Sequence, residues 1–359
     1  KNKEIINMKR IGVLTSGGDA PGMNAAVRAV VRTALTNGVE VMGIYRGYSG
    51  LIDGDIKLLK IRDVSNTVNK GGTMLYSDRC PEFKTPEGMA KAVETCNKFG
   101  IDGIVACGGD GTFRGAMELT AHGIPCVGIP CTIDNDITST DNTIGYDTAM
   151  NTVIELVDKL RDTCESHARC SVVEGVGRGA GDIELNTSIA SGASAVVIPE
   201  APFDADALCK RIKKARKIGK RNFIIIVSEG VGKEYGPNLV KKIQEEAEVE
   251  TKFARLAHIV RGGAPSLKDR VLASAMGVYA VEQLLDGKSD IVICERRGEI
   301  VALDITYALT ADMLYKNKIT VNDISENFDR KTLESMVELV EERRRNMARL
   351  VKIEDTINL

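Results

Sequence analysis

Two carboxylates stand two residues apart in Thr132-Ile133-Asp134-Asn135-Asp136, directly after the apolar run Cys126–Pro130. A short apolar run that ends at a proline is typical of a buried strand, so we expect both acids in the loop at its carboxyl end. Open α/β sheets bind their ligands at that edge. Asp134 could act as a general base with Asp136 as a metal-linked partner, but carboxylate-rich turns are also common without a chemical role. The pair alone leaves both interpretations open.

A first glycine loop lies near the start of the chain. The apolar run Ile11–Thr15 leads into Ser16-Gly17-Gly18-Asp19, and a helical pattern follows from Met23 to Leu35. In a strand–loop–helix arrangement, the backbone N–H groups at the helix start can hold a phosphate. The loop matches neither the Walker motif nor G-x-G-x-x-G, so by itself it could equally be a tight turn.

A second glycine loop is more specific. The apolar run Gly103–Cys107 leads into Gly108-Gly109-Asp110-Gly111-Thr112, and a helix is expected from Thr112 to His122. Three glycines let the backbone approach a bulky anion, whereas Asp110 adds negative charge. A carboxylate beside phosphate is repulsive unless a divalent cation lies between them, so the motif predicts Mg²⁺ held partly through Asp110.

Basic side chains follow other apolar runs. The expected strand Cys170–Glu174 opens onto Gly175–Asp182, where Arg178 stands among glycines and suits a phosphate, although a solvated arginine is the alternative. The run Leu256–Val260 carries His258 and leads to Arg261-Gly262-Gly263. A lone buried histidine is usually structural, and an anion site is an equal alternative here.

The whole chain repeats a strand–loop–helix pattern. This repetition predicts parallel sheets with helices on both faces, and 359 residues suffice for about two domains. Further strands are expected at Val39–Tyr45, Ala195–Pro199, Phe223–Ser228 (ending at Glu229) and Asp290–Cys294, and further helices at Arg62–Asn69, Pro86–Phe99, Asp147–Cys164, Leu208–Ala215, Arg270–Leu285 and from Arg330 onward.

The composition argues against several classes of protein. A net charge of -2 and 4% aromatic residues give no general attraction to nucleic acid or to anionic membranes. No apolar stretch approaches the roughly 20 residues of a membrane helix, and the first residues lack the apolar core of a signal peptide. Nine scattered cysteines without a C-x-x-C pair favour reduced thiols and therefore a cytoplasmic protein.

The three motifs Gly17-Gly18-Asp19, Gly108–Thr112 and Thr132–Asp136 together resemble those of the bacterial 6-phosphofructokinases, and the similarity extends from about Lys9 to Leu309. The resemblance implies an α/β fold of two three-layer αβα domains with mainly parallel sheets and the active site in the cleft between them. It implies a larger ATP-binding domain (1–145 plus 259–312) and a smaller fructose 6-phosphate-binding domain with an extra C-terminal helix (146–258 plus 313–359).

The resemblance also implies the reaction. The γ-phosphoryl group of ATP would pass to O1 of fructose 6-phosphate with Mg²⁺ present, giving fructose 1,6-bisphosphate and ADP in glycolysis. Asp134 would take the proton of the sugar hydroxyl, flanked by Thr132 and Asp136, and Arg178 would stabilise the transferring phosphoryl group. Asp110 would bind the metal.

Binding residues carry over in the same way. The nucleotide would contact Gly18, Tyr48, Arg79, Cys80, Gly109, Asp110, Gly111 and Thr112. Fructose 6-phosphate would contact Thr132, Ile133, Asp134, Asp136, Arg169, Val176, Gly177, Arg178, Glu229, Lys252, His258 and Arg261. Arg169 would reach the sugar phosphate of a neighbouring subunit, which implies a homotetramer with shared active sites.

Some positions depart from the family pattern. Lys252 replaces a second arginine expected at the 6-phosphate, with Arg255 about one turn away, and Val176 replaces a methionine. Gly111 favours ATP, because pyrophosphate users tend to carry aspartate there. Cys131 fits neither donor class, so a pyrophosphate-dependent or mixed-donor enzyme remains an alternative, as does a non-catalytic regulatory paralogue.

The allosteric nucleotide site of the family is partly retained. Arg28, Arg32, Arg161 and Lys220 match it, but Ile61, Ser194 and Ile218 stand where charged groups are expected. Loss of charged partners weakens the binding of a polyanion. We therefore expect weak or altered regulation by ADP and phosphoenolpyruvate.

Overall fold

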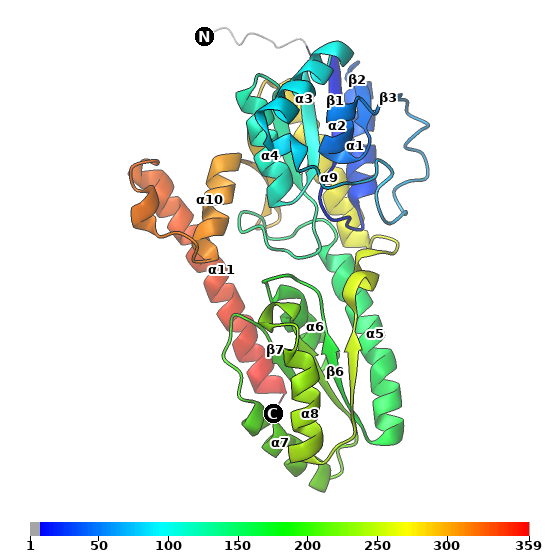
Figure 1. Ribbon diagram of the computed structural model, residues 1–359, viewed down its shortest axis with the longest axis vertical. Helices are drawn as coiled ribbons and strands as arrows, with labels where there is room; N and C mark the ends of the chain where they lie inside the picture. The colour runs from blue at the N-terminus through cyan, green and yellow to red at the C-terminus, as the bar shows by residue number, and fades with distance from the viewer. Residues whose placement is uncertain (1–7, 359) are drawn as a thin grey trace. The chain divides into compact units, whose positions relative to one another are not determined.

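The computed structural model describes residues 8–358, which divide into two compact units, each built around its own sheet (Figure 1). Unit 1 contains the chain up to Ile133 together with Ile137–Thr148 and Arg261–Glu341. Unit 2 contains Asp134–Asp136, Ala149–Val260 and the chain from Glu342 onward. The chain therefore passes between the units several times, and the first passage falls within the loop of the paired acids.

Unit 1 has a seven-stranded sheet in the order β11-β10-β5-β4-β1-β2-β3. The five inner strands are parallel, and the two edge strands pair antiparallel. The central strands are buried on both faces, which explains why they read as continuous apolar runs. The strands are β1 Arg10–Thr15, β2 Glu40–Ile44, β3 Ile56–Leu59, β4 Gly103–Gly108, β5 Cys126–Pro130, β10 Ile291–Arg296 and β11 Glu299–Asp304.

Helices cover both faces of this sheet (Figure 1). On one face α1 and α9 pack closely, because a Cβ atom at Gly277 would lie 2.7 Å from the Cβ of Ala29. On the other face Phe113 of α4 is buried against the strands with residues of α2, α3 and α10. The helices are α1 Met23–Thr36, α2 Gly47–Asp53, α3 Pro86–Phe99, α4 Asp110–Ala121, α9 Leu267–Leu285 and α10 Ile305–Tyr315, with short 3₁₀ turns η1 Glu82–Lys84 and η4 Val321–Ile324.

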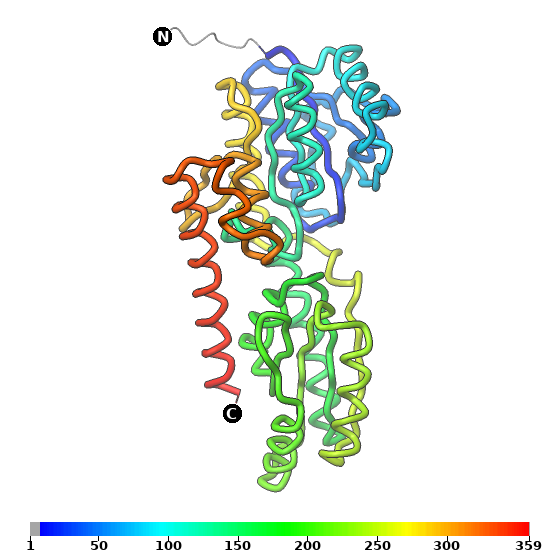
Figure 2. Tube along the Cα trace, turned by 60° about the vertical axis from the view of Figure 1, so that its left-hand side comes forward, coloured from blue at the N-terminus to red at the C-terminus, as the bar shows by residue number. Residues whose placement is uncertain are grey.

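Unit 2 has a four-stranded, fully parallel sheet in the order β7-β8-β6-β9. Helices α7 and α8 contribute to one apolar cluster with the strands, and α6 and the end of α11 contribute to another. The elements are β6 Cys170–Glu174, α6 Asp182–Ser191, β7 Ala195–Val197, α7 Ala205–Lys217, β8 Phe223–Val227, η2 Glu229–Val231, α8 Tyr235–Ala247 and β9 Thr251–Arg255. Three further elements belong partly to each unit: α5 Tyr146–His167, η3 Ala257–Arg261 and α11 Arg330–Ile357. Figure 2 traces α11 as one continuous helix that ends near the C-terminus.

The predicted α/β class, with mainly parallel sheets and helices on both faces, is confirmed. The helix predicted at Arg62–Asn69 is wrong, because this stretch forms successive turns. Its side chains bond to the local backbone instead: Ser65 Oγ donates to the carbonyl of Ile61 at 3.3 Å, and Thr67 Oγ1 to that of Val64 at 2.8 Å. Another strand, β11, follows Asp290–Cys294 and was not predicted.

The structure divides the chain differently from the predicted domains at the C-terminal side. Residues 313–341 belong with unit 1 rather than with the smaller unit. The reason is a small apolar core in which Met336 and Leu339 of α11 pack with Leu314 of α10. Residues 1–7 and 359 of the predicted domains lie outside the described part of the chain.

Within residues 8–358, no helix combines the length and the apolar composition needed to cross a membrane.

Candidate active site

The loop after β5 brings the predicted base and the predicted arginine together in unit 2. Asp134 is 1% exposed, and Nε of Arg178 lies 3.2 Å from its Oδ2 atom. The Arg178 side chain is 63% exposed, so its guanidinium can meet a ligand while it remains beside the carboxylate. A buried carboxylate next to an accessible guanidinium can accept a proton and stabilise a nearby phosphate.

The loop of Asp134 and the loop of Arg178 each contain a non-glycine residue with a left-handed backbone conformation. Asn135 has φ of 48° and Arg178 has φ of 54°. Such conformations cost about 1–3 kcal/mol each and persist where the surroundings hold them, often at functional sites. The backbone at Asp134 and Arg178 is therefore preset by contacts elsewhere in the unit.

Two glutamates hold the loop that carries Arg178. Oε1 of Glu229 accepts hydrogen bonds from the backbone N–H groups of Gly177 at 3.2 Å and Arg178 at 2.8 Å. Oε1 of Glu200 accepts from the N–H of Gly181 at 2.9 Å. Glu229 was predicted to bind sugar hydroxyls, and in the structure it fixes the backbone next to Val176, which is itself buried.

A third glutamate lies beneath this loop. Glu184 of α6 is fully buried, and within the described residues neither of its carboxylate oxygens has a hydrogen-bond partner. A Cβ atom at Gly175 would lie 2.3 Å from its Oε1 atom, so the glycine makes room for the acid. Burial, and next the nearby Glu200 and Glu229, raise the pKa of Glu184 well above its ordinary value. The sequence offered no signal for this residue.

The two glycine loops lie side by side at the ends of β1 and β4 in unit 1. Thr112 Oγ1 donates to the carbonyl of Ser16 at 3.1 Å and so links the loops. A Cβ atom at Gly108 would lie 2.2 Å from Thr112 Oγ1, whereas one at Gly109 or Gly111 would meet nothing within 4 Å. The space beside Gly109 and Gly111, at the N-terminus of α4, suits a phosphate group.

Asp110, the predicted metal ligand, begins α4. Its Oδ1 atom is buried and has no hydrogen-bond partner within the described residues, while Oδ2 lies 3.6 Å from Nζ of Lys316. Asp312 of α10 lies close by, and burial together with the charge of Asp110 raises the pKa of Asp312 well above its ordinary value. An unsatisfied carboxylate oxygen fits a hard divalent cation.

The protein by itself does not surround such a cation. Within residues 8–358, no group of three or more histidine, cysteine, aspartate or glutamate side chains is arranged to hold a metal ion. A cation at Asp110 would therefore take its remaining ligands from substrate oxygens and water, as is usual for Mg²⁺.

Tyr48 is placed differently from the prediction. Its ring is buried and stacks on Phe83 with 4.0 Å between ring centroids, and its hydroxyl donates to the carbonyl of Thr112 at 2.5 Å. Tyr48, which is 5% exposed, thus supports the start of α4 from the core. An exposed aromatic residue that the motifs did not include, Tyr76, precedes Ser77, whose hydroxyl donates to the carbonyl of Gly17 at 2.5 Å.

The other predicted nucleotide residues lie in the same unit. Arg79 is exposed and Cys80 is half-buried in the loop before η1. A Cβ atom at Gly18 would lie 3.0 Å from Nη1 of Arg261. The structure therefore brings Arg261, predicted to bind the sugar phosphate, to the first glycine loop.

Arg169 and Lys252 meet on one carboxylate in unit 2. Nε of Arg169 lies 2.8 Å from Glu250 Oε2, and Nζ of Lys252 lies 2.9 Å from Oε1. These two cations hold the pKa of Glu250 down at about 2. Arg255 does not lie one helical turn from Lys252, because both stand on strand β9, and Arg255 pairs with Glu174.

His258, the other predicted phosphate ligand, is exposed in the short turn η3.

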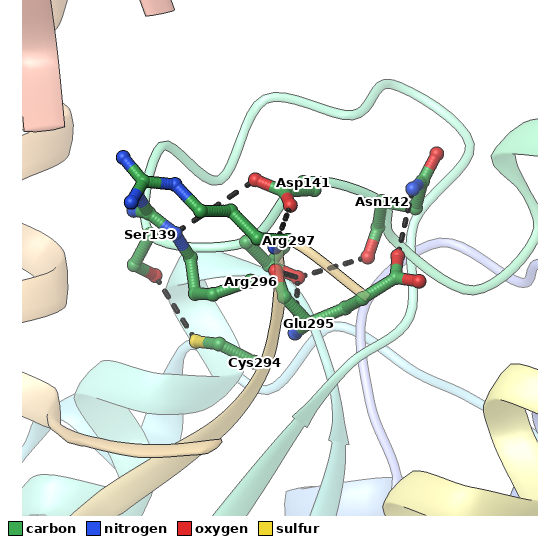
Figure 3. Close-up of polar contacts among 8 residues, drawn as sticks. Ser139, Asp141, Asn142, Cys294, Glu295, Arg296 and Arg297 are labelled. Atoms are coloured by element: carbon green, nitrogen blue, oxygen red, sulfur yellow. Dashed lines mark hydrogen bonds and ion pairs between the residues drawn. The ribbon is translucent and has the colours of Figure 1, made fainter. Parts of the chain in front are cut away.

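The chain downstream of the paired acids is anchored on β10 (Figure 3). Asn142 donates to Oε2 of Glu295 at 2.7 Å, and the N–H of Asp141 donates to the carbonyl of Glu295 at 2.8 Å. Asp141 in turn accepts from the N–H of Arg297 at 2.5 Å, and Cys294 contacts Ser139. These bonds fix the segment that follows the loop.

The predicted effector residues fall in both units. Arg28 and Arg32 lie on α1 in unit 1. In unit 2, Arg161 donates to the carbonyl of Ser191 and to Asn222 Oδ1 at 3.2 Å, and Nζ of Lys220 lies 5.4 Å from the ring centroid of Phe223. Their regulatory role stays a prediction.

Comparisons with known proteins agree with these motifs. Residues 10–284 match the family model described as "Phosphofructokinase". The chain is 57% identical over 298 residues to an "ATP-dependent 6-phosphofructokinase" of Bacillus pumilus and 55% identical to one of Bacillus subtilis, in each case over 83% of this chain and 93% of the relative. A solved phosphofructokinase of Saccharomyces cerevisiae superposes with a TM-score of 0.81 at 33% identity, over 93% of this chain and 49% of that one. The chain belongs to the phosphofructokinase family.

Proposed function

We propose that this protein is an ATP-dependent 6-phosphofructokinase, which transfers the γ-phosphoryl group of ATP to O1 of fructose 6-phosphate. The products are fructose 1,6-bisphosphate and ADP, as in glycolysis. The observation that carries the proposal is the contact between the buried Asp134 and the exposed Arg178, 3.2 Å apart on two loops with preset backbone. The two Bacillus relatives named above carry the same activity in their names.

In this mechanism Asp134 accepts the proton of the sugar C1 hydroxyl as its oxygen attacks the γ-phosphorus atom. The new O–P bond forms while the bond from that phosphorus to ADP breaks. Arg178 stabilises the negative charge on the transferring phosphoryl group. A positioned general base contributes roughly 10²–10⁴-fold to the rate of such a step. Thr132 and Asp136 flank the base.

The glycine loops of unit 1 bind the donor. Backbone N–H groups at the start of α4 and the space at Gly109 and Gly111 take its phosphates, and open space at Gly111 leaves room for the α-phosphate of ATP. Asp110 would hold Mg²⁺, which when bound shields the charge of the donor phosphates. Cys131 is a buried thiol, and a thiol has no cationic form, so this position offers no positive charge to pyrophosphate.

The proposal also covers how the protein binds fructose 6-phosphate, how its subunits assemble and where it is located in the cell. Arg169 and Lys252 supply positive charge for the 6-phosphate and His258 supplies a hydrogen-bond donor, with Arg169 acting on a neighbouring subunit of a homotetramer. The effector site, with Ile61 and Ile218 exposed, responds weakly to ADP and phosphoenolpyruvate. We assign the enzyme to the cytoplasm, which agrees with nine cysteines that are all free thiols.

Initial rates with fructose 6-phosphate and Mg²⁺ test the proposal, with ATP and pyrophosphate compared as donors. We expect turnover with ATP and little with pyrophosphate. Faster turnover with pyrophosphate would favour the pyrophosphate-dependent alternative, and the absence of turnover with either donor would favour a regulatory paralogue.

The role of the base has its own test. Asp134→Asn keeps the shape of the side chain but cannot accept the proton, so we expect kcat to fall by roughly 10²–10⁴-fold. ATP binding, measured by calorimetry, should change little, since the nucleotide residues lie elsewhere in the chain. An undiminished kcat would exclude Asp134 as the base.

A further inference from the structure

We propose that Arg343, on the C-terminal helix α11, is a positioning residue for catalysis. It holds the loop of Asp134 and the segment that follows Arg178, and it thereby sets the geometry of the base and the arginine. The inference rests on the proposed function and concerns contacts within unit 2 alone.

The Arg343 guanidinium joins two chain segments. Its Nη2 atom donates to the backbone carbonyl of Asn135 and lies 3.2 Å from Oδ1 of Asp182. Asn135 stands between Asp134 and Asp136, and Asp182 begins α6, four residues after Arg178. A planar guanidinium carries five N–H donors in a fixed fork, so one arginine can orient both segments at once.

Burial makes this contact costly to lose. The side chains of Arg343 and Asp182 are only 13% and 14% exposed. Other acidic groups lie nearby. Asp136, Glu184 and Glu200 each interact electrostatically with Asp182. Removal of Arg343 leaves Asp182 buried without its cation, and breaking one side of a buried ion pair is strongly destabilising for the local structure.

The packing of α11 on α6 places Arg343 beside Asn135 and Asp182. Met347 lies one turn further along the helix and packs with Leu185 and Ile198, together with Leu350 and Val351. Two turns beyond Met347, Oε1 of Glu354 accepts from the hydroxyl of Ser188 at 3.2 Å. Residues spaced by three and four share one helical face, so this stripe docks α11 on α6 with Arg343 at its upstream end.

Arg343 also lies outside residues 10–284, which the family model matches. The contact is thus a contribution of the C-terminal part of this chain to loops whose motifs are general to the family. The contact also explains the left-handed backbone of Asn135. The hydrogen bond from Arg343 to the Asn135 carbonyl holds this residue in that conformation.

Kinetics of Arg343→Met and Arg345→Met in the full-length enzyme test the proposal. Both variants lose one positive charge from α11, but Arg345 is exposed and serves as the matched control. Since misplacement of catalytic groups by about 1 Å can cost roughly 10²-fold, we expect Arg343→Met to lower kcat by roughly 10- to 100-fold. The KM for ATP should stay within about twofold, and added guanidinium ion should partly restore kcat in Arg343→Ala.

A second measurement does not depend on activity. Hydrogen exchange at residues 132–136 should become faster in Arg343→Met and stay unchanged in Arg345→Met. Unchanged exchange there, or a kcat equal to that of the control, would overturn the proposal. If the unaltered protein shows no turnover at all, the proposed function fails, while the exchange experiment still decides whether Arg343 holds the loop.

Discussion

At the scale of single residues, the site depends on carboxylates that are held in three different environments. Asp134 is buried beside a guanidinium, Glu229 accepts two backbone N–H groups, and Glu184 has no hydrogen-bond partner within the described residues. A buried charge without a partner is expensive, so an acid in the position of Glu184 takes up a proton instead. Side-chain carboxylates thus have three roles around the loops of Asp134 and Arg178.

The raised pKa of Glu184 should have a measurable effect on stability. Because its pKa is raised in the folded protein, the folded state binds a proton that the unfolded chain releases above about pH 4.5. This residue therefore makes the protein less stable as pH rises above that value. Glu184→Gln removes the effect. The melting temperature of the variant, relative to that of the unaltered protein, should therefore rise as the pH increases from 5 to 8.

The control for this prediction is Glu245→Gln, which changes an exposed glutamate in the same unit. Its melting curve should stay parallel to that of the unaltered protein across the pH range. Parallel curves for Glu184→Gln as well would mean that Glu184 is ionised in the folded state.

At the scale of elements, α11 has two successive roles along 28 residues. Its first half, through Met336 and Val340, closes the small core against α10 in unit 1. Its second half, from Arg343 to Glu354, docks on α6 in unit 2. The division explains why the compact units of the structure differ from the predicted domains after residue 312. An apolar stripe predicts that a helix packs on a partner, but it does not identify the partner.

A substitution in the first half tests its contribution. Met336 is fully buried, so Met336→Ala should cost about 2–5 kcal/mol of unfolding free energy through lost burial and a cavity. Val337→Ala is the neighbouring control, because Val337 is 36% exposed and its loss should cost much less. Urea denaturation measures both values. Equal costs for the two variants would show that α11 does not close this core in solution.

At the scale of the whole molecule, the proposed tetramer with shared sites predicts complementation between subunits. Arg169→Ala and Asp134→Asn should each be nearly inactive, for loss of the phosphate ligand and of the base respectively. If Arg169 serves a neighbouring subunit, mixed tetramers contain some sites with both residues intact. Co-refolding of the two variants should then restore activity well above the sum of the separate preparations.

Activity equal to that sum would mean that each chain completes its own site. A refolded mixture of each variant with itself is the control, since it corrects for losses during refolding. Sedimentation of the unaltered protein gives the number of subunits independently.

The sequence by itself determined the elements and the loops. The strands β1, β4, β5 and β6 were predicted, as were the glycine loops after β1, β4 and β6, because their signals are local: apolar runs, glycine clusters and helical periodicity. Asp110, Asp134 and Arg178 were found because they stand at the ends of those runs. The short edge strands β3 and β11 were missed, because an antiparallel edge strand of four to six half-exposed residues has little pattern of its own.

Only the tertiary structure decided which side chains meet. It turned Tyr48 into the core, set Glu229 on the backbone of Gly177 and Arg178, placed the buried Glu184 beneath them, and brought Arg343 to Asn135 across about two hundred residues of chain. Each of these contacts joins residues far apart in the sequence. The free energy of burying a polar group depends on its hydrogen-bond partner, and only the folded chain brings that partner into place.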